Sequence, residues 1–171
     1  PSGMVSTFAG GSLGSADGQG TAAQFNRPLD VAVDAMGNLY VADFSNDRIR
    51  KITPEGMVST LAGFSRGFAD GQGTAARFNG PYGLAVDALG NLYVGDLGNN
   101  RIRKITPGGM VSTFAGSTTG FADGQGTAAQ FFNPFGVALD ALGNVYVADA
   151  RNNRIRKITP EGMGVPWRDL S

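Results

Sequence analysis

One feature constrains the fold of this chain more than any other, because nearly all of its 171 residues repeat with a period of 53. The period is marked by Met4, Met57, Met110 and Met163. Residues 4–56 are identical to residues 57–109 at 38 of 53 positions and to residues 110–162 at 39 of 53. A long fixed period is typical of solenoids and propellers, whose units pack on their neighbours. The near identity indicates either recent duplication or deliberate construction.

Each unit contains four short segments that alternate in character and are separated by turn residues, which is the pattern of β-strands. The first such set is residues 29–34, 39–43, 48–53 and 57–63, the last of which begins the second unit. Gly37 supplies a positive φ for the hairpin between the first two segments. Ile49 and Ile52 fall on opposite faces of the third segment, as expected for a sheet packed on both sides.

Four short strands in 53 residues predict one blade of a β-propeller with an extra loop, since blades usually occupy ~40–50 residues. The remaining candidate for a helix is residues 20–25, which span about one turn. We interpret this segment and its copies as a loop that places a phenylalanine over each blade edge. The three phenylalanines are Phe25, Phe78 and Phe131.

A longer motif recurs in all three units: P-x-G-x-A-x-D-x-x-G-N-x-Y-V-x-D-x-x-N-x-R-I-R-K-I. Residues 81–105 match it throughout. Residues 28–52 match it with Asp30 in place of the glycine. Residues 134–158 match it with Leu139 before Asp140. This motif is similar to the NHL-repeat pattern, and the resemblance covers nearly the whole chain.

The resemblance implies an all-β propeller with four-stranded antiparallel blades, most often six, that commonly binds protein or RNA through one face. Related propellers include lactonase-like and lyase-like enzymes, whose metal sites use histidines or acidic and amide groups converging on the channel. No such constellation is legible in this sequence. We therefore expect a non-enzymatic, self-assembling scaffold or binding module without catalytic residues. A metal-assisted hydrolase or lactonase and an RNA-binding module remain the alternatives.

The ends of the chain predict how the ring closes. Residues 1–10 resemble the outer strand of a blade, whereas residues 163–171 depart from the repeat and contain Pro166, which has no N–H for a sheet hydrogen bond. We expect residues 1–171 to form one half-propeller of three blades. The blades are predicted at residues 28–63, 81–116 and 134–162, the last without an outer strand of its own.

Three blades are too few to close a ring, because known propellers have ~4–8. We expect a homodimer with six blades, in which residues 5–9 of each chain complete the third blade of the other and leave no exposed sheet edge. The alternative is that the sequence is part of a longer propeller.

Composition limits the chemistry and the partners. The 14 basic and 14 acidic residues balance, so no net field draws the chain to nucleic acid or to an anionic membrane. No apolar run approaches the ~20 residues of a membrane span. Histidine and cysteine are absent, which excludes His-dependent triads, thiol nucleophiles and thiolate or His-ligated metal sites. We expect no cofactor, no metal and no membrane partner, consider nucleic acid unfavoured, and find no signal for a compartment.

Long loops between consecutive blades are expected on the same face as the turns that follow each second strand. Loops on a rigid scaffold are where binding usually occurs, and the differences among the three units cluster there. This loop face is therefore the surface on which we expect a protein or small ligand, although loops also tolerate change without any function. The candidate ligand-binding residues are Arg27, Asp30, Phe44, Asn46, Arg66, Leu97, Asn99, Asn133, Arg151 and Asn152.

Three further patterns have structural interpretations. The Asp-Gly-Gln-Gly motif beginning at Asp17 lacks the helix and lysine of a phosphate loop and the alternating ligands of a calcium loop, so we expect a turn. Arg50, in a basic cluster of the third strand, is expected to pair with Asp43 and nearby asparagines between blades rather than with nucleic acid. Asp30 is expected to be a solvated residue at the channel mouth.

Overall fold

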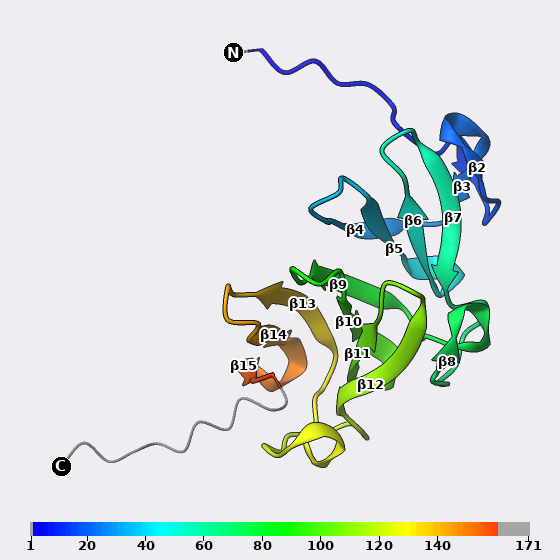
Figure 1. Ribbon diagram of the computed structural model, residues 1–171. Coiled ribbons are helices and arrows are strands. Elements are labelled where there is room, and N and C mark those ends of the chain that lie inside the picture. The colour runs from blue at the N-terminus through cyan, green and yellow to red at the C-terminus, as the bar shows by residue number, and fades with distance from the viewer. Residues whose placement is uncertain (1, 161–171) are drawn as a thin grey trace.

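The computed structural model describes residues 2–160, which form an all-β molecule of three antiparallel sheets fanned about a common centre (Figure 1). Residues 161–171, which include the predicted tail 163–171, Trp167 and the end of the predicted third blade, lie outside the described residues. The innermost strand of the second sheet contacts the innermost strands of the first and third sheets, and the outer strands radiate away from them.

The first sheet contains the four strands that the repeat predicts, with a short fifth strand on the outer edge. Its spatial order is β2-β7-β6-β5-β4. The strands are β2 (Gly18–Gln19), β4 (Pro28–Val33), β5 (Leu39–Asp43), β6 (Arg48–Ile52) and β7 (Met57–Ala62). The glycine-rich motif of the preceding loop therefore contributes a strand to the edge of its own blade.

The second sheet repeats this arrangement and the third sheet repeats its first three strands. The second contains β8 (Gly71–Gln72), β9 (Pro81–Val86), β10 (Leu92–Asp96), β11 (Arg101–Ile105) and β12 (Met110–Gly116). The third contains β13 (Pro134–Leu139), β14 (Val145–Asp149) and β15 (Arg154–Ile158). Among residues 2–160, no strand pairs with the outer edge of β15.

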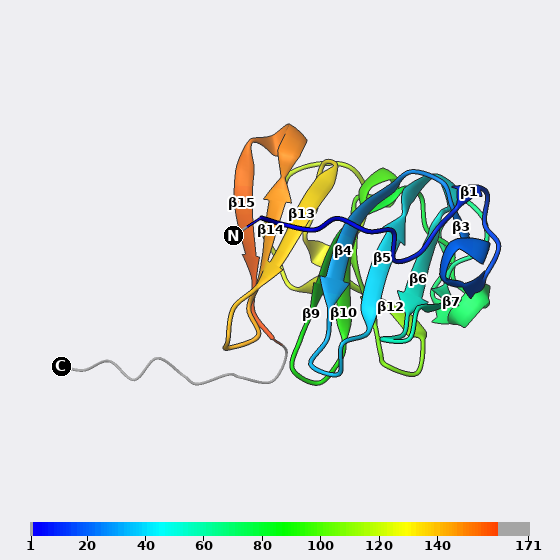
Figure 2. The ribbon, with the colours of Figure 1, turned by 90° about the horizontal axis from the view of Figure 1, so that it is seen from above.

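The connections are turns and loops with short 3-10 segments. In Figure 2 the strands run side by side, and the tight turns after β4 and β9 lie together at the lower end. The loop before the first blade contains two short strands, β1 (Ser12–Leu13) and β3 (Gln24–Phe25), which pair with each other. The predicted segment at residues 20–25 contains one 3-10 turn. The 3-10 segments are η1 (Gly20–Ala22), η2 (Phe44–Asn46), η3 (Gly73–Ala75), η4 (Leu97–Asn99), η5 (Gly126–Ala128) and η6 (Ala150–Asn152).

Apolar side chains fill the two spaces between neighbouring sheets. Tyr40 and Ile49 of the first sheet pack in one cluster with Leu92 and Val94 of the second. Ile52 packs in a different cluster on the opposite face of the first sheet, as the alternation predicts. Tyr93 and Ile102 of the second sheet, the counterparts of Tyr40 and Ile49, pack in a further cluster with Val145 and Val147 of the third sheet. The face of the first sheet that carries Tyr40 and Ile49 therefore packs on the face of the second sheet that carries Leu92 and Val94, and the second and third sheets pack in the same way.

A buried arginine joins each blade to the loop that precedes it. Arg50 donates from Nη1 to Asp43 at 2.8 Å and from Nη2 to Asp17 at 2.7 Å, and its guanidinium lies 5.0 Å from the ring centroid of Phe25. The expected pairing with Asp43 is present, but the partners belong to the same blade, so the expectation of a bridge between blades was wrong. The glycine-rich motif is held because the Asp17 carboxylate also accepts a hydrogen bond from Thr60 at 3.0 Å.

The same network recurs in the second blade, where Arg103 and Asp96 are fully buried and 2.8 Å apart. Burial raises the pKa of the Asp96 carboxyl, and hydrogen bonds from the Asn79 N–H, Asn99 and Arg103 oppose this shift. A buried guanidinium is costly without a carboxylate partner, so the contacts of Arg103 with Asp96 and Asp70 hold the loop in one position.

The hairpins at the other end of the blades are held by an aspartate. In the first blade Asp34 accepts hydrogen bonds from the Asn38 side chain at 2.8 Å and from the Tyr40 hydroxyl at 3.0 Å. Burial would raise the pKa of the Asp34 carboxyl, but the hydrogen bonds from Asn38, Tyr40 and the Met36 N–H outweigh it and lower the pKa. Burial, with the hydrogen bond and charge of Asp34, raises the pKa of Tyr40 to about 12.

Replacing Asp96 by alanine should destabilise the fold by about 3–5 kcal/mol, because Arg103 then stays buried without its carboxylate. Urea unfolding measures the loss. The matched control is Asp123→Ala, whose carboxylate is 85% exposed. An exposed partner should cost less than about 1 kcal/mol when removed. Equal losses from the two substitutions would contradict the importance assigned to the buried pair.

Alkaline pH should remove the contribution of the Tyr40 phenol. Its folded pKa of about 12 exceeds the ordinary value of 10.0, so the stabilisation is complete below pH 10 and is lost as the pH rises through 12. Phenolate absorbance of the native protein should include a contribution titrating near pH 12 that is absent from Tyr40→Phe. The variant should also lose less stability across this interval, and identical titration curves would refute the assignment.

Candidate functional site

The long loops and the 3-10 turns after each second strand lie at the same end of the blades and form the loop face. In the first blade the Ser45 N–H donates to the Asn26 carbonyl at 3.0 Å. Asn46 Nδ2 donates to the Gly14 carbonyl at 2.7 Å and to Asp43 at 2.8 Å. The turn and the loop therefore hold each other in place.

Three of the sequence-predicted site residues have this anchoring role. Asn99 makes the equivalent bonds to the Gly67 carbonyl and Asp96, at 2.7 and 2.8 Å, and Asn152 makes them to the Gly120 carbonyl and Asp149, both at 2.8 Å. The side-chain amides of Asn46, Asn99 and Asn152 are thus engaged within their own blades. Their geometry is that of structural residues.

Aromatic and cationic side chains meet on the loop face. The guanidinium of Arg27 lies 5.2 Å from the ring centroid of Phe44. Phe44 is in edge contact with Tyr82 of the second blade, with centroids 6.2 Å apart, and Tyr82 with Phe135 of the third at 4.8 Å. Sequence reasoning singled out Arg27 and Phe44 but missed the other two rings. The signal for them was the residue after the first proline of each motif, which is aromatic in the second and third units.

The remaining loop-face candidates are spread along the rim. Arg151 is exposed and its guanidinium lies 5.1 Å from the ring of Phe132. Leu97 is half-buried at the start of η4. Arg66 and Asn133 do not join a common ligand cluster, because each contacts a residue of the blade before it.

Asp30 bridges two blades, which corrects the expectation of a solvated residue at the channel mouth. Its Oδ2 accepts the Leu84 N–H of the second sheet at 2.7 Å, and its Oδ1 accepts the Val31 N–H at 2.9 Å. The second blade has Gly83 at this position, where a Cβ would collide with the Phe135 carbonyl oxygen of the third. Asp30 therefore has a structural role between innermost strands.

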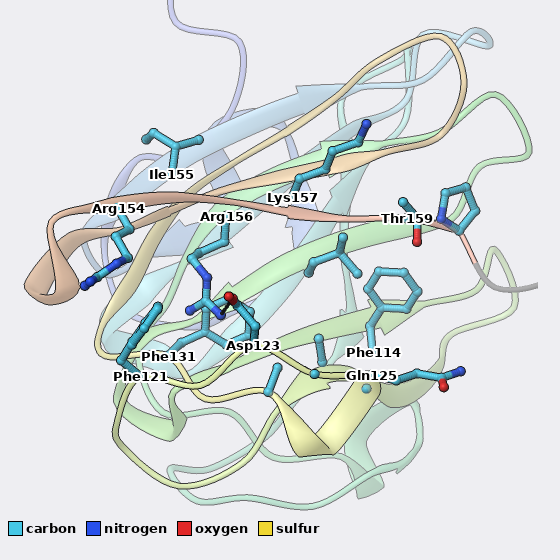
Figure 3. A pocket seen from close by; sticks show the side chains of 16 residues that line it. Phe114, Phe121, Asp123, Gln125, Phe131, Arg154, Ile155, Arg156, Lys157 and Thr159 are labelled. Carbon is cyan, nitrogen blue, oxygen red and sulfur yellow. Dashed lines mark hydrogen bonds and ion pairs between the residues drawn. The ribbon is translucent and has the colours of Figure 1, made fainter. Parts of the chain in front are cut away.

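A groove of about 960 Å³ follows the open edge of β15 (Figure 3). Figure 3 shows β15, from Arg154 toward Thr159, on one side and the loop containing Asp123 and Gln125 on the other, with Arg156 and Asp123 paired. In the first and second sheets this space holds β7 and β12. The third blade thus has an open groove between β15 and the loop containing Asp123, at the position that the fourth strand occupies in the other two blades.

Both outer faces of the three-sheet unit expose apolar groups that are buried elsewhere in the repeat. Ile155 on the third sheet is 75% exposed, whereas the equivalent Ile49 and Ile102 are fully buried. On the first sheet Val31 is 56% exposed, whereas the equivalent Leu84 is 5% exposed. These two surfaces are the third-sheet face and the first-sheet face of the unit.

Residues 2–160 contain no group of three or more His, Cys, Asp or Glu side chains placed to hold a metal ion. Within the same range no helix has the length and apolar character needed to cross a bilayer.

Four-stranded antiparallel sheets that fan around their innermost strands are the blades of a β-propeller. The NHL repeat family matches residues 25–52, 78–105 and 133–158, and the chain is therefore an NHL-repeat protein.

Several known proteins are similar to it. NHL repeat-containing protein 2 of Homo sapiens is 31% identical over 137 residues, which is 72% of this chain and 19% of that protein. Protein SUPPRESSOR OF QUENCHING 1, chloroplastic, of Arabidopsis thaliana is 38% identical over 95 residues, or 54% of this chain and 9% of that protein. An auxiliary nutrient binding protein of Bacteroides thetaiotaomicron has 26% identity and a TM-score of 0.68, covering 74% of this chain and 36% of its own. The chain thus spans only a minor part of each relative.

Proposed function

We propose that two copies of this chain close into a six-bladed NHL propeller, and that the ring is a non-enzymatic binding module whose loop face contacts a protein or small ligand. The observation that carries the proposal is the exposure of Ile155 on the third-sheet face, at a position that is fully buried in both other blades. An apolar sheet face of this kind gains stability when another sheet covers it.

The third-sheet face and the first-sheet face correspond to the two faces that pack together between neighbouring blades. The third-sheet face carries Tyr146 and Ile155, the counterparts of Tyr40 and Ile49, which contact the second sheet. The first-sheet face is the counterpart of the surface that receives them. A second copy placed with its first sheet on the third sheet of the other copy therefore repeats the packing already present between blades. Because the relation is reciprocal, two such contacts close a ring of six.

The groove beside β15 fits an exchanged strand from the second copy. In the first sheet Val58 pairs with Ile52 on one side and with Gly18 on the other. The repeat translates this register into pairing of Val5 with Ile158 and Gly124 of the other chain. Val5 is 92% exposed here, whereas Val58 is 1% exposed. Ser2–Ala9 make no strand pairing within the described chain, so this segment is available.

A second contact supports the same register. In the first and second blades a threonine of the outer strand donates to the aspartate of the glycine-rich motif, from Thr60 to Asp17 and from Thr113 to Asp70. The exposed fraction of these carboxylates is 50% and 46%, but that of Asp123 is 85%. The exchanged strand would place Thr7 of the second copy on Asp123 and complete the third network.

The proposed binding role is supported by the shape and chemistry of the loop face and by one similar structure. Phe44, Tyr82 and Phe135 form a row of rings across three blades, and Arg27 lies on the first of them. Ring closure by two-fold symmetry would give six blades with two such rows. The similar propeller from Bacteroides thetaiotaomicron is described as an auxiliary nutrient binding protein, which favours binding over catalysis.

Sedimentation equilibrium should give a mass near twice that of the 17.7 kDa chain. Val5→Asp should weaken dimerisation more than about a hundredfold, because the carboxylate would be buried without a partner in each third blade. A folded wild-type protein of single-chain mass would contradict the proposal.

The matched control is Met4→Asp. Its counterparts Met57 and Met110 are 46% and 47% exposed in completed blades, so a carboxylate there stays in water. This variant should dimerise as the wild-type chain does. Because Met4 and Val5 are both exposed in the single chain, a stability difference between the variants is expected only through assembly. Identical dimerisation of the two variants would refute strand exchange.

A further inference from the structure

Three of the six repeat positions that differ in all three units lie where one blade meets the next at the loop face. We call each such contact a seam, and four positions build it. The earlier blade contributes the first residue of its 3-10 turn and the left-handed residue that follows the turn. The later blade contributes one residue from the middle and one from the end of its preceding loop. The first seam is built by Phe44, Asp47, Arg66 and Gly80.

In the first seam a large residue stands opposite the smallest one. A Cβ on Gly80 would lie only 2.9 Å from Cε2 of Phe44, so the Phe44 ring occupies the space of any side chain at position 80. The Gly80 N–H donates to Asp47 Oδ1 at 2.8 Å, and Arg66 Nε lies 3.5 Å from Asp47 Oδ2. Shape and charge are therefore both matched across this seam.

The second seam keeps the backbone contact and changes the side chains together. The Asn133 N–H donates to Asn100 Oδ1 at 2.9 Å, and Asn100 Nδ2 donates to Thr119 Oγ1 at 2.9 Å. A neutral pair thus replaces the charged pair of the first seam. Leu97 takes the place of the phenylalanine, and Asn133 takes the place of the glycine. A smaller residue on one side accompanies a larger one on the other.

The remaining members of the four positions are split between the two ends of the unit. Ala150 and Asn153 stand on the third blade, and Leu13 and Arg27 stand before the first. Asn153, Leu13 and Arg27 are exposed. Across the seams, the turn residue becomes smaller as the loop residue opposite becomes larger: Phe44 faces Gly80, and Leu97 faces Asn133. Ala150, the smallest turn residue, and Arg27, the largest loop residue, would continue this series if the third blade of one chain met the first blade of another.

The backbone of Arg27 already has the seam conformation. Its φ is 56°, as for Gly80 at 65° and Asn133 at 53°, although arginine rarely adopts the left-handed region. Its guanidinium lies over its own Phe44, which turns the long side chain along its own blade. The Arg27 N–H corresponds in the repeat to the N–H groups of Gly80 and Asn133, which donate across the first two seams.

We propose that Arg27 of one chain packs over Ala150 of the other and donates its backbone N–H to Asn153 Oδ1, so that the contact between the two chains repeats the seams within each chain. The inference rests on the proposed six-bladed dimer and names the residues that join the two chains at the loop face. Alanine at position 150 leaves room for the Arg27 side chain, whereas a phenylalanine there would fill that space as Phe44 does opposite Gly80.

The test swaps the pair of the first seam into the third. Ala150→Phe should weaken dimerisation at least about tenfold, measured by sedimentation equilibrium, because the ring and Arg27 need the same space. Ala150→Phe combined with Arg27→Gly recreates the pair of Phe44 and Gly80, and should return the dissociation constant to within about threefold of Arg27→Gly alone. Rescue by the second substitution also shows that the first did not prevent folding.

Two results would overturn the inference while leaving the dimer intact. One is a dimeric wild-type chain whose dissociation constant is unchanged by Ala150→Phe. The other is a loss in Ala150→Phe that Arg27→Gly does not restore. A wild-type chain of single mass overturns the proposed dimer itself, so the two failures are distinguishable. The control Ala150→Ser, which adds a single oxygen atom, should dimerise as the wild-type chain does.

Discussion

The structure depends on sheets that are apolar on both faces and must therefore be covered on both. The second sheet satisfies this requirement, because Ile102 is buried against the third sheet and Val94 against the first. The described chain covers one face of the third sheet. It covers one face of the first sheet and part of the other, because Ala23 and Phe25 of the preceding loop pack with Val41 and Ile52 while Val31 stays 56% exposed. Hydrophobic burial is non-directional and scales with area, so the remaining faces favour whatever surface can repeat the same packing. A second copy of this chain offers such a surface.

Specific geometry comes from polar groups at the ends of the sheets. The buried pair of Arg103 and Asp96 fixes the loop of its blade to its second and third strands, and the equivalents do so in the other blades. Such a pair costs desolvation and contributes little net stability, but it tolerates few alternative arrangements. The precise position of the loops that it secures then allows the seams to discriminate among side chains such as Gly80 and Arg27.

The residues that differ among the three units make contacts across blades, which changes how these differences are interpreted. Sequence reasoning offered two interpretations of the differences in the loops, a tuned binding surface or simple tolerance of change. The contacts of Arg66 with Asp47 and of Asn133 with Asn100 indicate a third, in which the differences are paired across blades. The rings of Tyr82 and Phe135 are in edge contact on the loop face, where we propose that a ligand binds.

The sequence by itself determined the repeat, the four strands of each blade, the all-β class and the NHL family, because alternation and turn residues such as Gly37 act over a few residues. It also predicted the pair of Arg50 and Asp43, since both lie in one hairpin. Only the tertiary structure decided that Asp30 caps a backbone N–H of the next blade and that Tyr82 meets Phe135. These contacts join residues about one repeat apart, and their partners are set by the angle between sheets rather than by any local pattern.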